Sequence, residues 1–167
     1  MKAFFIILCI VFILIPIIVY TCSIIKCINM DVNCISYLEL AADANSVDLA
    51  EKHLTTAINY LETNNLTSGH TGIIIKNPRN DIGIWYDNLK SAQEQLQELK
   101  EKEDLTDLEE SNALMKLRET LLNEGYVTHP SMISFVPNHV AWFWWMCLVW
   151  ILWFLALIFG IAAYEQY

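Results

Sequence analysis

The sequence predicts an all-α membrane protein in which two transmembrane helices flank a long antiparallel helical hairpin of coiled-coil character. Residues 3–25 and 140–164 contain no Asp, Glu, Lys, Arg or His, whereas the segment between them holds every acidic residue except Glu165. The chain is 55% hydrophobic yet carries a formal net charge of −9, a combination that a single soluble domain rarely shows. The polar segment also repeats its apolar residues at helical spacing.

The first apolar run, residues 3–25, is expected to form transmembrane helix 1. A helix needs about 20 residues to cross the hydrocarbon core, so the run is long enough. A cleaved signal peptide is the alternative, because Lys2 precedes the apolar run. The run is longer than a typical signal-peptide core and no small-x-small cleavage site follows it. We therefore expect a permanent span with a kink at Pro16.

The second apolar run is expected to form transmembrane helix 2 over 139–164, because backbone groups in lipid have to pair internally. It carries five of the six tryptophans. Tryptophan usually lies at the headgroup level, but Trp150 and Trp153 lie deeper than that. We expect the helix to pack on other helices or, alternatively, to hold a flat apolar ligand such as a quinone, pigment or sterol. The residues predicted to do so are Trp145, Trp150, Trp153, Ala156, Gly160 and Ala163.

The acidic segment 26–138 is expected to form the extramembrane hairpin. Apolar residues recur there at steps of three and four, and a stretch rich in Asn, Gly and Pro separates the two arms. Residues 44–46 are an alternative break within the first arm, and residues 106–109 read as a capping box that begins a further helix. The predicted helices cover about 31–64, 81–102 and 106–123, and the predicted loop covers 65–80.

One apolar stripe of the hairpin has the alternating steps of four and three that characterise a heptad seam. Two helices bury little core by themselves, so we expect this seam to engage partner chains. A self-contained three-helix bundle is the alternative. The predicted partner-binding residues are Leu54, Ile58, Leu61, Trp85, Leu89, Leu96 and Leu99.

Sequence patterns of catalytic, metal or phosphate sites are missing from the chain. The four histidines are scattered, and no CxxC pair, Gly-rich phosphate loop or nucleophile elbow occurs. We therefore expect no enzymatic activity, no metal and no cofactor. The acidic charge argues against nucleic acid, and spans without charged residues argue against a transporter. Cys27 and Cys34 are about 10 Å apart along a straight helix, so a disulfide requires that segment to unwind.

Residues 40–99 contain the stretch AADANSVDLAEKHLTTAINYLETNNLTSG, followed by NDIGIWYDNLKSAQEQLQEL. These stretches resemble a helical segment of an uncharacterised family of small bacterial proteins that are often membrane-anchored. It covers about a third of the chain and implies a helical domain with a fixed loop. It implies no activity and no catalytic residue.

These patterns lead us to expect a non-catalytic structural or accessory subunit of a larger membrane assembly, or a self-assembling scaffold. A membrane module that binds a lipid, quinone or pigment on the tryptophan-rich face is the alternative. The expected partners are the lipid bilayer and either other subunits or further copies of the chain. The resemblance implies a bacterial inner membrane. Lys2 favours cytoplasmic termini and an acidic domain outside, although Lys26 argues weakly for the reverse.

Overall fold

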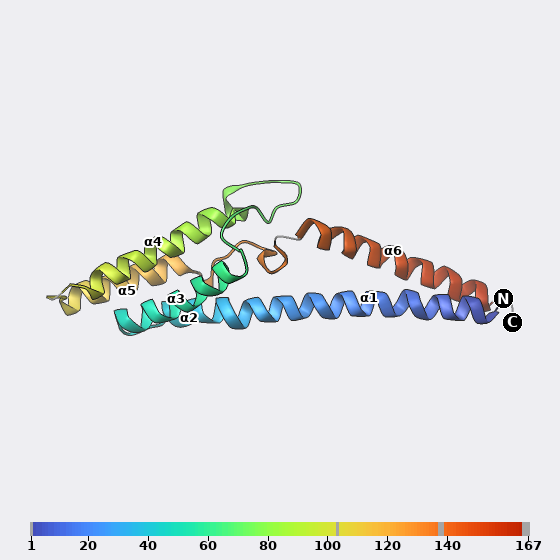
Figure 1. Cartoon of the computed structure of the whole chain (residues 1–167), viewed down its shortest axis with the longest axis horizontal. Helices are drawn as coiled ribbons and strands as arrows, with labels where there is room; N and C mark the ends of the chain where they lie inside the picture. The colour runs from blue at the N-terminus through green and yellow to red at the C-terminus, as the bar shows by residue number, and fades with distance from the viewer. Residues whose placement is uncertain (1, 103, 137–138, 165–167) are drawn as a thin grey trace. The chain divides into compact units, whose positions relative to one another are not determined.

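The computed structural model is mostly helical (Figure 1). Two helices are long and apolar enough to cross a membrane, over Ile10–Ala42 and Val140–Ile161. The expectation of two apolar helices of spanning length, one towards each end of the chain, is therefore confirmed. The structure describes residues 2–102, 104–136 and 139–164.

Unit 1 of the two compact units comprises residues 1–27 and 138–167. It contains most of α1 (Lys2–Met30) and all of α6 (His139–Tyr164). Pro16 lies inside α1, and the helix continues past it. In the most apolar window of each candidate span, only 11% and 6% of the residues are buried within the chain. Both helices therefore leave most of their apolar surface open to whatever surrounds them.

Two side-chain contacts link the helices of unit 1. The rings of Phe12 and Phe159 have centroids 6.0 Å apart, and the Lys26 ammonium lies 5.2 Å from the ring centroid of Trp142. From the first contact to the second, the residue number rises on α1 and falls on α6, so the two helices are antiparallel. A cation over the face of an indole ring is attracted by the ring quadrupole. The charge of Lys26, at the end of the first apolar run, therefore has a partner on α6.

Unit 2, residues 28–137, begins with a helix that is interrupted where one long helix was expected over 31–64. A π-helical turn, η1 (Asp31–Ile35), is followed by α2 (Ser36–Ala42), and α3 (Val47–Thr63) begins after a four-residue turn. The single helix is therefore wrong, and the alternative break at 44–46 is where the chain turns. The reason is local: Ser46 is extended, and its hydroxyl accepts a hydrogen bond from the Leu49 N–H, which caps a new helix.

The second half of unit 2 follows the expected order more closely. Helix α4 (Ile82–Lys100) is capped by Asp81, and α5 (Asp107–Leu121) is opened by a complete capping box. A short hairpin of β1 (Leu122–Asn123) and β2 (Tyr126–Val127) then turns through residues 124 and 125. Gly125 has φ of +87°, a left-handed conformation that glycine adopts readily. Two 3₁₀ turns lie in the connections, η2 (Pro78–Asn80) and η3 (Ile133–Phe135).

The capping box at the start of α5 makes acid stability depend on Glu109. Its carboxylate accepts from the Lys102 ammonium and from the Thr106 backbone and hydroxyl, and these bonds, in that order, lower the pKa of Glu109 to about 2. The stabilisation is complete above the ordinary pKa of 4.5 and is lost as the pH falls towards 2. We expect Glu109→Gln to remove this part of the acid transition, measured by far-UV circular dichroism of the full chain in micelles. Glu119→Gln, an exposed acid later on α5, should leave the transition unchanged.

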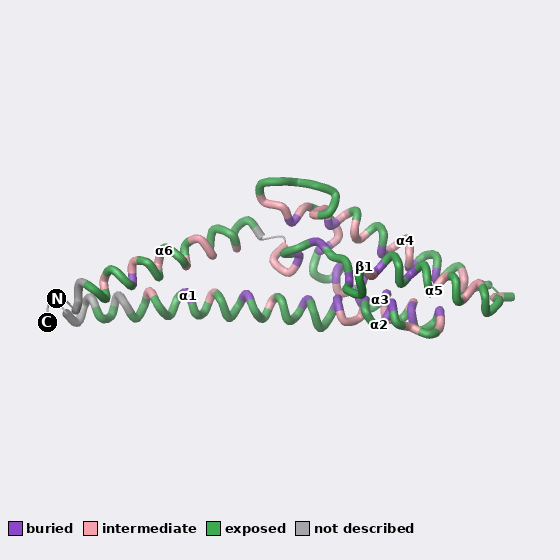
Figure 2. Tube along the Cα trace, turned by 180° about the vertical axis from the view of Figure 1, so that it is seen from behind, coloured by how far each residue is buried: buried purple, intermediate pink, exposed green. Residues whose placement is uncertain are grey.

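The four longer helical segments of unit 2 pack in a ring. Helix α2 packs against α3, α3 against α4, α4 against α5, and α5 back against α2. Their inward faces hold the buried residues, as Figure 2 shows. The side chains with almost no exposed surface include Leu38, Leu54, Ile58, Leu61, Ile82 and Leu89. The predicted hairpin is therefore a bundle of four helical segments in which successive helices alternate in direction.

A ladder of polar contacts fixes the register of α3 against α4. The Tyr86 hydroxyl donates to the Glu62 carboxylate at 2.6 Å, and the Gln93 amide donates to the Thr55 hydroxyl at 2.7 Å. Towards the other end of the pair, Lys100 forms a salt bridge with Asp48, with 3.0 Å between nitrogen and oxygen. Residue numbers fall on α3 as they rise on α4, so the two helices are antiparallel. Because Gln93 is buried, a slip in register would remove the Thr55 hydroxyl that accepts from its amide N–H.

One long-range hydrogen bond joins the first residue of α3 to α5. The backbone N–H of Val47, the first residue of α3, donates to the Glu110 carboxylate of α5 at 3.0 Å. The first N–H groups of a helix have no partner within the helix, and a carboxylate at that position is also favoured by the helix dipole. Glu110 therefore caps α3 from the first turn of another helix.

Candidate interaction surfaces

The predicted partner-binding seam lies mostly inside unit 2. Its members on α3 and two of those on α4 are buried, because α2 and α5 complete the ring around them. The other two are partly buried and pack against the same core. The structure therefore reassigns the seam from partner binding to the folding core of the unit. The buried members are Leu54, Ile58, Leu61, Leu89 and Leu96, and the partly buried ones are Trp85 and Leu99.

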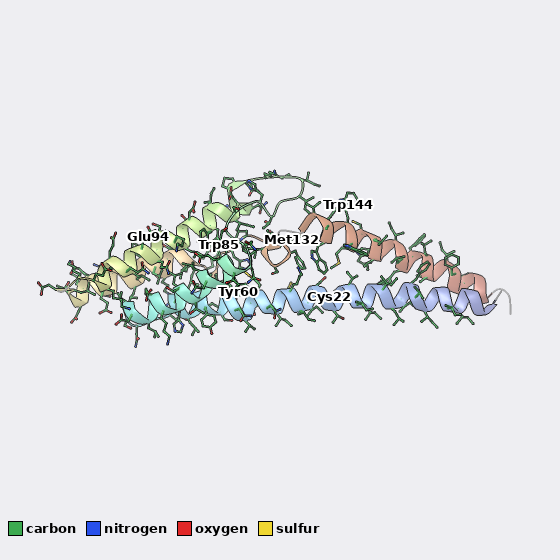
Figure 3. The ribbon with its side chains drawn as sticks, in the orientation of Figure 1. Cys22, Tyr60, Trp85, Glu94, Met132 and Trp144 are labelled. Carbon is green, nitrogen blue, oxygen red and sulfur yellow. The ribbon has the colours of Figure 1, made fainter. Side chains whose placement is uncertain are left out.

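Trp85 also has a role that the heptad pattern did not indicate. Its indole N–H donates to the backbone carbonyl of Thr128 at 2.8 Å. Thr128 follows the β1–β2 hairpin, and its own N–H donates to the Leu121 carbonyl. Trp85, labelled in Figure 3, therefore ties the start of α4 to the connection that leaves unit 2. A contact over 43 residues between a side chain and a loop carbonyl leaves no periodic signal in a sequence.

The predicted packing residues of α6 do not all face one way. Ala156 is buried, whereas Trp145, Trp150 and Trp153 are 49%, 70% and 48% exposed. A side-chain carbon added at Gly160 would meet nothing within 4 Å. The side chain of Ala163 lies outside the residues described. Of the two small residues whose surroundings the structure describes, Ala156 is therefore covered and Gly160 is open.

A different set of side chains covers the outward face of α6. They recur at alternating steps of four and three residues, which places them on one stripe of the helix. All are exposed except Cys147, which is half-buried, and Trp150 and Phe154 are the most exposed, at 70% and 66%. We call this set the α6 outer stripe: Phe143, Cys147, Trp150, Phe154, Leu157 and Ile161.

The tryptophan in the middle of the α6 outer stripe presents an unusual polar group. Trp150 lies ten residues into the span from Val140, about 15 Å along the helix axis. Its ring meets Trp153 edge-to-face, with centroids 6.0 Å apart and an interplanar angle of 70°. Within the described part of the chain, neither indole N–H has a hydrogen-bond acceptor. Hydrocarbon supplies none either, so an acceptor would have to come from another molecule.

A groove of about 580 Å³ lies between α4 and α5 on the surface of unit 2. Its floor is apolar at Leu96 and Leu117, and its rim is polar. The Lys116 ammonium donates to the Gln95 side-chain carbonyl across it at 2.9 Å, which holds the two helices together.

The described cysteines are free, and no group of possible metal ligands forms among the described residues. Cys27 and Cys34 are both free, and the segment that contains them is helical throughout, so the unwinding that a disulfide would need has not occurred. Cys34 is fully buried in the core of unit 2. Among the residues that the structure describes, no three His, Cys, Asp or Glu side chains gather as metal ligands would.

Comparisons with protein-family models, with curated protein sequences and with solved structures found no match to this chain. The resemblance of residues 40–99 to a bacterial family therefore stays an expectation.

Proposed function

We propose that the chain is an integral membrane protein that acts as a non-catalytic structural or accessory subunit of a membrane assembly. In this proposal α1 and α6 cross the bilayer, and the α6 outer stripe packs against a transmembrane helix of another subunit. The observation that carries the proposal is the indole N–H of Trp150, exposed deep in the span without an acceptor in the described chain. A neighbouring helix can supply a carbonyl or hydroxyl acceptor, which lipid tails cannot.

The shape of the α6 outer stripe supports the same proposal. Its four-three spacing is the pattern that left-handed helix pairs use in membranes as well as in water. Its bulky members would fill the holes of a facing helix, and Cys147 leaves a smaller site between Phe143 and Trp150. The buried partner-binding seam supports it indirectly, because unit 2 already covers those residues, whereas α6 leaves most of its apolar surface uncovered.

The proposed topology has both termini in the cytoplasm and unit 2 on the outer side of a bacterial inner membrane. Two spans place both ends of a chain on the same side. Lys2, at the start of α1, favours the cytoplasmic side for those ends. The bacterial setting rests on the resemblance of residues 40–99 alone.

Gentle detergent extraction of the untagged chain from native membrane tests the proposal. Sizing followed by mass spectrometry should find it in a defined species with at least one further polypeptide, or with further copies, at fixed stoichiometry. A single chain with only detergent and lipid would contradict the proposal. A single chain with a stoichiometric apolar carbonyl compound would instead favour the ligand-binding alternative, since a quinone carbonyl could accept from Trp150.

A further inference from the structure

The connection between α3 and α4 exposes two isoleucines far more than a soluble loop normally does. Ile74 is 89% exposed and Ile75 is 70% exposed. They are adjacent, so their side chains form a single apolar tip. Isoleucine is among the side chains most often found buried, and an exposed apolar patch often marks a surface that binds a protein or a membrane.

The same tip is the most basic part of an otherwise acidic unit. No acidic residue occurs from Thr63 to Asn80, whereas Lys76 and Arg79 directly follow the isoleucines, and both are exposed. Within the described chain, neither Lys76 nor Arg79 forms an ion pair. Four other basic residues of unit 2 do pair with carboxylates: Lys90, Lys100, Lys102 and Arg118.

Backbone hydrogen bonds close the base of the loop and hold the tip in a defined position. The Thr71 N–H donates to the Asn80 carbonyl at 2.8 Å, and the Ile82 N–H donates to the Gly69 carbonyl at 2.9 Å. Inside the loop the chain folds tightly at Gly72, where an added side-chain carbon would lie 2.1 Å from the Ile75 carbonyl oxygen. Only glycine permits that approach.

The loop lies at the end of unit 2 where the chain enters and leaves the unit. Helices α2 and α3 are antiparallel across a short turn, and η1 packs against α3, so the end of α3 lies beside the first residues of unit 2. At the start of α4, Trp85 is bonded to Thr128, which belongs to the connection that leads out of the unit. Both covalent links towards the apolar helices therefore leave from the end that carries the loop.

We propose that Ile74, Ile75, Lys76 and Arg79 form a membrane-interface anchor, named here the isoleucine tip. The two isoleucines enter the boundary between headgroups and acyl chains, and the two basic side chains contact the phosphates of anionic lipids. Apolar side chains combined with neighbouring basic ones are the chemistry by which surface segments bind anionic membranes. The inference rests on the proposed membrane location, because the covalent links to both proposed spans leave unit 2 at the end that carries the loop.

Photo-crosslinking from within the loop tests this inference. A benzophenone amino acid is placed at position 75 of the full chain, reconstituted in vesicles of equal parts phosphatidylcholine and phosphatidylglycerol. The control carries it at position 108, because Leu108 is 71% exposed, as Ile75 is, but lies near the α4–α5 turn at the opposite end of unit 2. We expect lipid adducts at position 75 in about tenfold excess over position 108. Each of Lys76→Gln and Arg79→Gln should lower the yield of lipid adducts at position 75 about fivefold.

Two results would overturn the inference: equal lipid adducts at positions 75 and 108, or adducts from position 75 to protein alone. If Lys76→Gln and Arg79→Gln left the yield of lipid adducts at position 75 unchanged, the role of anionic headgroups would be refuted. An alkaline carbonate wash separates these outcomes from failure of the proposed membrane location. If the chain is washed off the vesicles, both proposals fail, whereas an integral chain without lipid adducts at position 75 refutes the isoleucine tip alone.

Discussion

Replacing Leu54 by alanine should lower the free energy of unfolding of unit 2 by about 2–5 kcal/mol, as large-to-small substitutions in tight cores do. Leu54 has no exposed surface, and it lies on the face of α3 that the other helices of the ring enclose. The lost methyl groups no longer gain from burial, and the surrounding ring can close only partly around the cavity. Urea titration of the full chain in micelles, followed by far-UV circular dichroism, measures the change, because urea unfolds unit 2 more readily than helices embedded in a micelle.

Leu108→Ala is the matched control for this experiment. The chemical change is the same, but Leu108 is 71% exposed, so its loss should alter the free energy of unfolding by no more than about 0.5 kcal/mol. The pair also decides what the leucine seam is for. If Leu54→Ala left the stability of the free chain unchanged and instead released partner chains, the seam would be an interface after all.

The second large effect is expected on the α6 outer stripe. If α6 packs as proposed, Trp150→Leu should weaken association with the proposed partner subunit by at least about 2 kcal/mol, roughly a 30-fold shift from assembled to free chain, because buried tryptophans dominate interface energies. The substitution removes the indole N–H and much of the ring area while keeping the helix apolar. Gentle extracts from membranes with each variant, resolved by size, give the ratio of assembled to free chain.

Trp144→Leu provides the comparison for Trp150→Leu. Trp144, labelled in Figure 3, is 66% exposed, close to the 70% of Trp150, but it lies off the α6 outer stripe. It should leave the ratio of assembled to free chain unchanged. Equal losses in the two variants would show that tryptophan content, and therefore general contact with lipid, matters more than the stripe.

Composition and local rules predicted much of this fold. Both apolar helices follow from length and the lack of charge, and the start of α5 follows from the Thr106–Glu109 capping box. The turn at residues 43–46 was harder, because Ala44 is a strong helix former, Asn45 disfavours a helix only weakly, and the decisive feature is the extended backbone of Ser46. A local rule allowed the break but could not require it.

The candidate surfaces were less predictable, for a physical reason. Periodicity shows that Leu54 and Leu89 lie on apolar faces, but it does not show whether the same chain or another one covers them. The contacts that decide this question join distant residues, such as Glu110 with the N–H of Val47, and polar groups of this kind follow no repeat. On α6 the sequence shows many tryptophans but not which side of the helix is uncovered. The burial of Ala156 marks the covered side, and the α6 outer stripe lies away from it.

The order of packing in unit 2 has a kinetic consequence. Three of the four helix contacts in the ring join neighbours in the chain, and contacts between near neighbours in sequence form quickly. The fourth, α5 on α2, closes the ring, and the accompanying hydrogen bond between Val47 and Glu110 spans 63 residues. Closure therefore bears the largest loop entropy and is expected to come last in folding and first in unfolding. An excursion of α5 would uncover the seam without melting the rest, and such a transient opening is the route by which those leucines would meet another chain.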